Sequence, residues 1–201
     1  MKTMGEKSFW VVRTAARFGL LFVHPIMRVQ GRENIPEGAC VICSNHVGLS
    51  DGPWLVFAIR PKKIMRIMVK AQLLHIPVLK YLFMWFNFIG VERESNDITA
   101  VKKALKALKE GEQLMLFPEG TRVKRGTRIP AKTGAAMFAT RTGAPVLPVY
   151  LQVHRKLWRP IHIVIGKPYH MVPPGTRVKG EDLQPLTDEL MDKIYGMESM
   201  I

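Results

Sequence analysis

The 201-residue sequence has only two cysteines, Cys40 and Cys43, which stand in the apolar stretch C-V-I-C. This count excludes a framework of disulfide bonds. A C-x-x-C pair can form a redox centre or half of a zinc site, and His46 follows at a ligand-like spacing, but the sequence contains no second ligand pair. We therefore interpret both cysteines as small residues of a buried strand, and we expect no metal site.

Long apolar runs are also missing. No stretch of about 18 uninterrupted apolar residues occurs, so the sequence predicts no transmembrane helix. Residues 1–28 carry Arg13 and Arg17 within their apolar part and have no small-residue cleavage site, which argues against a secretory signal peptide. We expect a protein that is cytosolic or lies on a membrane without crossing it.

Acidic residues are absent from two long stretches. The formal net charge is +14. No acidic residue occurs between Asp51 and Glu92, and none occurs between Glu119 and Glu181. The second of these stretches contains twelve basic residues. Such stretches create a positive potential that attracts polyanions, anionic lipid surfaces or acidic proteins. The alternative is a solvated basic surface that only keeps the protein soluble.

The overall composition is that of one folded domain. Hydrophobic residues make up 47% and charged residues 23% of the chain, which excludes the composition of disordered proteins. A length of 201 residues fits one domain with a substantial core. We find no internal repeat, low-complexity tract or long linker.

The first segment has the spacing of an amphipathic helix. Between residues 7 and 23, aromatic and aliphatic side chains recur on one side and two arginines on another, before Pro25 interrupts the pattern. Aromatic residues opposite arginines fit a helix in a membrane interface, although most amphipathic helices pack on their own core. We treat residues 1–29 as a membrane-associating segment and residues 30–201 as the folded domain.

Strand patterns alternate with helical patterns along the remaining chain. Strands are expected at residues 39–44, 64–69, 88–91, 113–117, 146–153 and 161–165. Helices are expected at residues 52–59, 73–86 with a break at Pro77, 97–110, 132–142 and 181–197. The helix at 97–110 is expected to bury a stripe of Ile98, Val101, Leu105 and Leu108. This alternation predicts an α/β fold, in which helices cover a mixed β-sheet within a single domain.

The loop N-H-V-G-L-S-D follows the first of these strands and carries His46 and Asp51, five residues apart. If Ser50 or Asp51 caps the next helix, the loop can fold the Asp51 carboxylate back onto the imidazole. A carboxylate bonded to one ring nitrogen fixes the tautomer and stabilises the imidazolium that forms when the other nitrogen takes a proton. A simple hydrogen-bonded turn histidine is the alternative.

A protein nucleophile is not evident. Ser44 and Ser50 flank the histidine, but the motif G-x-S-x-G is absent. A histidine and an aspartate without a nucleophile indicate that the substrate supplies the attacking hydroxyl.

A second loop, F-P-E-G-T-R at residues 117–122, has the chemistry of an anion site. Gly120 permits close backbone approach, Thr121 offers a hydroxyl donor, and Arg122 presents a fork for two anionic oxygens. Lys70 and Arg93 each follow a predicted strand, and we expect them at the same edge because strand ends of one sheet lie close together.

Taken in order, these blocks resemble the lysophosphatidic acid acyltransferase family, the 1-acyl-sn-glycerol-3-phosphate acyltransferases. N-H-V-G-L-S-D is similar to the family's N-H-x-x-x-x-D, and F-P-E-G-T-R is similar to its third block. Val91 to Arg93 resembles the end of the second block, V-L-P-V-Y at 146–150 the fourth, and Lys132 to Gly134 the K-x-G that follows the third. The resemblance runs from about Gln30 to Lys167.

The second and third blocks depart from the family pattern at three positions. Asn87 stands where the family usually has glycine, Gly90 stands at the phenylalanine, and Val123 replaces a serine often found after the third block. None of these changes touches His46 or Asp51. They affect the expectation for the acceptor and for the acyl chain.

The resemblance implies a glycerolipid acyltransferase-like fold and a role in phospholipid biosynthesis. A fatty acyl group would pass from an acyl thioester to the 2-hydroxyl of lysophosphatidic acid, forming phosphatidic acid at the cytoplasmic face of the cell membrane. His46 would act as the base and Asp51 would hold it. The expected phosphate- or substrate-binding residues are Lys70, Arg93, Glu119, Gly120, Thr121 and Arg122.

The resemblance also implies partners. The acyl donor is acyl-CoA or acyl carrier protein as cosubstrate, without a metal or other cofactor, and the protein would bind an anionic membrane surface peripherally. Backbone amides near Gly120 would stabilise the tetrahedral oxyanion.

Two other functions stay open. One is an acyltransferase of the same superfamily that acts on glycerol 3-phosphate or another lysolipid. The other is a nonenzymatic nucleic-acid binder, which only the net charge and the isoelectric point of about 10.1 support. We expect no nucleic-acid partner, because the basic residues form no recognisable nucleic-acid-binding module.

Overall fold

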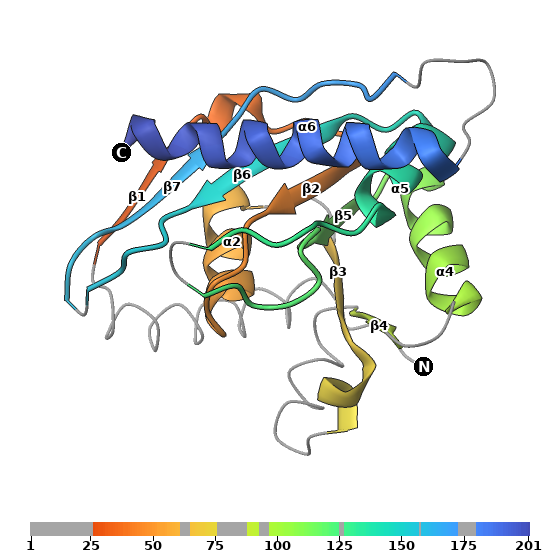
Figure 1. Cartoon of the computed structure of the whole chain (residues 1–201), viewed down its shortest axis with the longest axis horizontal. Helices are drawn as coiled ribbons and strands as arrows, with labels where there is room; N and C mark the ends of the chain where they lie inside the picture. The colour runs from red at the N-terminus through yellow and green to blue at the C-terminus, as the bar shows by residue number, and fades with distance from the viewer. Residues whose placement is uncertain are drawn as a thin grey trace.

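The computed structural model describes residues 26–60, 65–75, 88–92, 97–124, 127–156, 158–172 and 180–201. The helix expected at residues 7–23, most of the helical region expected at 73–86, and Arg93 lie outside the described residues. Within the described ranges, the chain forms one sheet with helices on both faces (Figure 1).

The sheet has seven strands in the order β1-β7-β6-β2-β5-β3-β4 in the described part of the chain. They are β1 (Met27–Gln30), β2 (Cys40–Ser44), β3 (Met65–Lys70), β4 (Ile89–Val91), β5 (Gln113–Leu116), β6 (Val146–Leu151) and β7 (Ile161–Ile165). The five strands from β6 to β4 run parallel, whereas β7 pairs antiparallel with β6 and parallel with β1. The predicted mixed sheet is therefore confirmed.

Four α-helices cover this sheet within the described ranges. They are α2 (Asp51–Ile59), α4 (Ile98–Lys109), α5 (Gly134–Thr142) and α6 (Leu183–Gly196). Short 3-10 helices occur at η1 (Arg32–Asn34), η2 (Ala71–His75), η3 (Gly180–Asp182) and η4 (Met197–Met200). The apolar side chains of α2 pack on one face, and those of α4, α5 and α6 pack on the other, where α6 runs across the sheet (Figure 1).

Strand β2 lies at the centre of the sheet and is buried on both faces. Cys40 contacts the α2 face and Cys43 the opposite face, because side chains alternate along a strand. Both thiols are free and fully buried, and burial raises the pKa of Cys40 to about 12. The interpretation of the cysteines as core residues is confirmed.

Helix α4 turns its alanines inward, and the predicted stripe is only partly buried: Leu108 is buried, and Val101 and Leu105 are half-buried against the core. Ile98 is 63% exposed, whereas the buried residues are Ala100, Ala104, Ala107 and Leu108. Ile98 is the first helical residue, directly after Asp97, whose side chain accepts the amide of Ala100 at 2.9 Å. Small alanine side chains allow the helix to lie close to the sheet, so the alanine face turns inward and the larger residues flank it.

Strand β1 has no counterpart among the predicted strands. Its four residues alternate between half-buried and exposed, and they pair with β7, more than 130 residues further along the chain. The sheet therefore begins at Met27, within the segment 1–29 that the sequence sets apart. No helix in the described ranges is both long and apolar enough to cross a bilayer.

Candidate active site

The sheet topology brings the two predicted loops to one edge. Strands β2, β5 and β6 run parallel and lie side by side, so the loops that follow them leave the sheet at the same edge. The loop with His46 follows β2, the loop 117–122 follows β5, and the connection 152–160 follows β6. We call this side of the sheet the catalytic edge.

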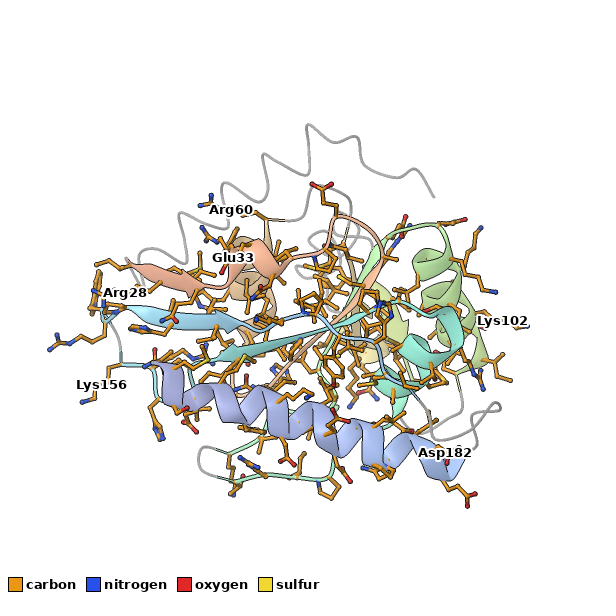
Figure 2. The ribbon with its side chains drawn as sticks, turned by 90° about the horizontal axis from the view of Figure 1, so that it is seen from above. Arg28, Glu33, Arg60, Lys102, Lys156 and Asp182 are labelled. Carbon is orange, nitrogen blue, oxygen red and sulfur yellow. The ribbon has the colours of Figure 1, made fainter. Side chains whose placement is uncertain are left out.

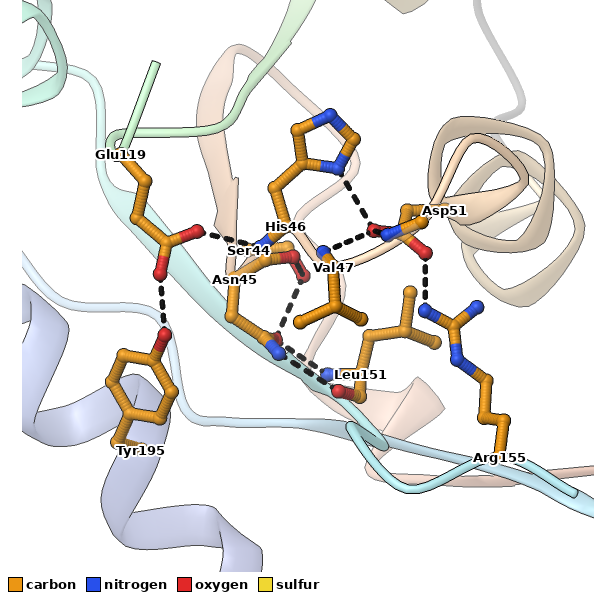
Figure 3. A network of polar contacts seen from close by, with 10 residues as sticks. Ser44, Asn45, His46, Val47, Asp51, Glu119, Leu151, Arg155 and Tyr195 are labelled. Carbon is orange, nitrogen blue, oxygen red and sulfur yellow. Dashed lines mark hydrogen bonds and ion pairs between the residues drawn. The ribbon is translucent and has the colours of Figure 1, made fainter. Parts of the chain in front are cut away.

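His46 and Asp51 form the predicted pair. The Nδ1 atom of His46 lies 2.8 Å from Oδ2 of Asp51, and the same oxygen accepts the amides of Val47 and Gly48 at 2.7 Å each (Figure 3). Ser50 stands at the N-cap position of α2 but makes no capping hydrogen bond with its side chain, contrary to the predicted role. The carboxylate of Asp51, the first residue of α2, turns back to its own loop and also benefits from the helix dipole.

Asp51 is fully buried and ionised. Burial raises the pKa of its carboxyl, but the hydrogen bond to His46, the charge of Arg155 and the amide of Gly48 together outweigh burial, so the net pKa lies below its usual value. A carboxylate held in this form keeps a proton on Nδ1 and leaves Nε2 as the basic nitrogen.

The imidazole is held in place by its surroundings. Its ring stacks on Phe117 with 4.0 Å between centroids and an interplanar angle of 14°. The side chain remains 18% exposed, and Nε2 has no hydrogen-bond partner among the residues that the structure describes. Figure 3 shows this nitrogen turned away from the polar network that holds Nδ1, so in the described part of the chain it is the ring nitrogen available to receive a proton.

Asn45 anchors the backbone directly before His46. Its side chain is fully buried, donates to the carbonyl oxygen of Leu151 and accepts the amide of Leu151, both at 2.8 Å (Figure 3). These two bonds join the end of β2 to the end of β6. The backbone at the histidine is therefore held in place by these bonds, although the side chain belongs to a loop.

Glu119 faces the interior, where both of its oxygens have partners. Oε2 accepts the amide of His46 at 2.7 Å, and Oε1 accepts the hydroxyl of Tyr195 on α6 (Figure 3). The residue is only 2% exposed, and burial raises the pKa of its carboxyl more than these hydrogen bonds lower it. We interpret Glu119 as a group that holds the two loops and α6 together.

The remaining residues of the second loop differ in exposure. Gly120 has φ 67°, and a Cβ there would lie 3.1 Å from Cε of Lys132. Its amide donates to the carbonyl of Phe117 at 2.9 Å, so this amide is not available for the oxyanion role that was expected near Gly120. Thr121 and Arg122 are exposed, as a phosphate-binding role requires.

The two loops are joined on both sides of the histidine. The amide of His46 is bound by Glu119, and its carbonyl accepts the amide of Val123 at 2.8 Å. Arg122 therefore directly precedes Val123, whose amide is bonded to the backbone of His46.

Lys70 lies further from this pair. It is the last residue of β3, and it pairs with β4, whereas the pairing of β3 with β5 ends at Ile67. Figure 1 shows this end of β3, with η2, projecting beyond the body of the sheet. Lys70 therefore ends a strand that stands two places from β2 in the sheet, and Arg93 lies outside the described residues.

Three residues of the site are not identified by sequence reasoning. Arg155 binds Asp51, Tyr195 binds Glu119, and Phe117 stacks on the imidazole. Arg155 is separated from Asp51 by 104 residues and appears in the sequence only as one of many basic residues. The useful signal was its place just after β6, a parallel neighbour of β2. No cluster of metal-ligating side chains occurs in the described part of the chain.

Comparisons with known proteins identify similar proteins of one family. The family described as Acyltransferase matches residues 26–152. A 1-acyl-sn-glycerol-3-phosphate acyltransferase of Borreliella burgdorferi is 33% identical over 147 residues, which cover 72% of this chain and 58% of that protein. A protein of the same name from Bacillus subtilis is 28% identical over 181 residues, which cover 87% of this chain and 89% of that protein.

A solved structure shares the fold. The crystal structure of the 1-acyl-sn-glycerophosphate (LPA) acyltransferase PlsC from Thermotoga maritima matches with a TM-score of 0.70 and 26% identity, covering 96% of this chain and 79% of that chain. The family match spans more than half of the sequence and contains both loops of the catalytic edge. With this fold and this histidine–aspartate pair in place, the chain belongs to the acyltransferase family.

Proposed function

We propose that this protein transfers a fatty acyl group from an acyl thioester to the 2-hydroxyl of 1-acyl-sn-glycerol 3-phosphate and so forms phosphatidic acid. The observation that carries the proposal is the buried Asp51 carboxylate on Nδ1 of His46, with Nε2 open at the catalytic edge. The names of the relatives supply the acceptor class.

The chemistry follows from the geometry of this pair. Nε2 of His46 takes the proton of the acceptor hydroxyl while its oxygen attacks the thioester carbonyl carbon. The tetrahedral intermediate then collapses, the carbon–sulfur bond breaks, and the imidazolium returns the proton to the leaving thiolate. Asp51 keeps the second proton on Nδ1 and balances the positive charge of the ring in both steps.

The function is tested by incubating the purified full chain with acyl-CoA or acyl–acyl carrier protein and with three acceptors in parallel. These are lysophosphatidic acid, glycerol 3-phosphate and an uncharged lysolipid. We expect thiol release and phosphatidic acid with the first acceptor. Preference for glycerol 3-phosphate would identify the related superfamily activity, and salt-sensitive RNA binding without thioester consumption would favour the nucleic-acid alternative.

Arg122 is the candidate for the acceptor phosphate, because it is exposed and adjoins the residue bonded to the backbone of His46. Arg122→Ala should raise KM for lysophosphatidic acid by roughly 10- to 100-fold, since a hydrogen bond to a charged group contributes about 1.5–3 kcal/mol. KM for the acyl donor should change much less, and Arg122→Lys should rescue only in part. Lys124→Ala, which removes an exposed charge from the same loop, is the control. Equal effects on both substrates would exclude a phosphate role.

We further propose peripheral attachment to the cytoplasmic face of the membrane. Leu49, Trp158 and Ile26 are 79%, 54% and 50% exposed. All three belong to the catalytic edge: Leu49 follows β2, Trp158 lies between β6 and β7, and Ile26 precedes β1, which starts beside the start of β7. Arg28 and Lys156 lie at the same end of the sheet (Figure 2). Apolar side chains beside basic ones suit an anionic bilayer surface.

Cosedimentation with vesicles tests this attachment. The full chain should pellet best with anionic vesicles and be released partly by salt, since each nearby Lys or Arg contributes about 1 kcal/mol. Deletion of residues 1–25 should weaken pelleting and leave β1 in place, because the strand starts at Met27.

Circular dichroism checks that the shortened chain is folded, and Leu49→Ser in the full chain provides a second variant. Equal pelleting of the full chain, the deletion and Leu49→Ser would contradict the attachment.

A further inference from the structure

The two oxygens of the Asp51 carboxylate have different partners. Oδ2 is shared by the imidazole and two backbone amides, as described above. Oδ1 is bound by Nη2 of Arg155 at 2.5 Å (Figure 3). Among the described residues, Arg155 is the only permanently charged group that forms an ion pair with this carboxylate.

We propose that Arg155 is a positioning residue of the active site, which holds the Asp51 carboxylate ionised and correctly oriented and thereby orients His46. The inference rests on the proposed function of the histidine–aspartate pair. It adds to that function a third residue, contributed by the connection between β6 and β7.

Burial distinguishes this ion pair from those on the surface. The side chains of Arg155 and Asp51 are 9% and 0% exposed, whereas those of the surface pair Arg128–Asp192 are 63% and 77% exposed. Exposed pairs contribute little, but removal of one partner from a buried pair leaves an uncompensated charge. Without Arg155, Oδ1 has no donor among the described residues, so the carboxylate would turn toward water or take a proton.

The position of Arg155 in the connection after β6 allows it to hold the Asp51 carboxylate. It follows Leu151 by four residues, and Leu151 is bonded twice to Asn45, which directly precedes His46. The loop that carries Asp51 and the connection that carries Arg155 therefore both start at the place where Asn45 and Leu151 join β2 to β6. The Arg155 side chain is only 9% exposed and binds Asp51, so little of its guanidinium is accessible to a substrate in solution. A guanidinium also stays charged at every working pH.

The charge of Arg155 also affects proton transfer. Within the described part of the chain, the groups that face His46 are the Asp51 carboxylate at its ring, the Glu119 carboxylate at its amide, and the neutral ring of Phe117. Arg155 supplies the positive charge on the far side of Asp51. Removing it favours the protonated form of the His46–Asp51 pair, so the pair should lose its proton only at higher pH.

The experiment compares Arg155→Met and Arg155→Lys with the unmodified full chain. For Arg155→Met we expect kcat to fall roughly 10- to 100-fold, by analogy with the loss of a partner that orients a metal-binding side chain. The acid limb of kcat/KM should move to higher pH, and KM for both substrates should stay unchanged. Arg155→Lys should restore part of kcat and most of the pH profile.

Arg141→Met is the matched control, because it removes an exposed guanidinium from the last turn of α5, at the end of the sheet where β6 begins and away from the catalytic edge. Proton NMR of the His46 ring gives a readout without substrate: the downfield Nδ1–H signal should be present in the unmodified chain and in Arg155→Lys, and weakened in Arg155→Met.

An unchanged pH profile and an unchanged ring signal in folded Arg155→Met would overturn the proposal, as would a raised KM of that variant for the acceptor with unchanged kcat. An unmodified chain without acyl transfer would refute the proposed function instead, and the ring signal would still decide the role of Arg155.

Discussion

Replacement of His46 by alanine in the full chain is expected to lower kcat of acyl transfer by about 100- to 10,000-fold, the usual effect of losing a positioned base. Nε2 of this residue is the basic nitrogen that faces the substrate side, and Asp51 cannot replace it because its carboxylate is buried. The fold should survive, since the side chain belongs to a loop and its backbone contacts with Glu119 and Val123 remain.

The measurement is the rate of thiol release, with thermal unfolding followed by circular dichroism. His154→Ala is the control, because this histidine is exposed in the connection that also carries Arg155. A folded His46→Ala protein that keeps most of the original rate would exclude His46 as the base.

Asp51→Asn should have an effect of similar size, up to about 10,000-fold in kcat if tautomer control is lost as in the serine protease triad. An amide has one oxygen and one NH2 group. If the oxygen faces the Val47 and Gly48 amides, the NH2 group meets the guanidinium of Arg155; in the opposite orientation it meets the two amides. Either way two donors face each other, and the imidazole loses its acceptor or its alignment.

The same substitution should change the pH dependence of stability. The pKa of Asp51 is lowered in the folded state, so its ionised form stabilises the fold above the unfolded value of about 3.9, and this contribution is lost as pH falls through the lower folded pKa. Denaturant unfolding should therefore show a smaller acid-induced loss of stability in Asp51→Asn than in the original chain. Asp192→Asn, at an exposed ion pair, should leave the pH dependence unchanged. Equal acid sensitivity of Asp51→Asn and the original chain would contradict the assignment.

Elements with a strong local pattern are predictable from the sequence. Strand β2 is a continuous apolar run, and α4 has a helical period, so both lie within about one residue of their predicted ends. Strand β1 is not predictable in this way, because four residues of alternating exposure carry little signal until β7 pairs with them. The buried face of α4 follows from close packing of its alanines, which a hydrophobicity pattern underweights.

The active site likewise has features that the local sequence predicts and features that depend on contacts between distant segments. The sequence by itself predicted the pairing of His46 with Asp51 as one of two possibilities, because a spacing of five positions limits how far apart these side chains can lie, and the structure then showed the contact. The sequence also determined the family, through the order of the motifs. Only the tertiary structure decided that Arg155 and Tyr195 complete the network. Contacts across 104 and 76 residues depend on the order of the strands and the packing of α6, and no local pattern records these.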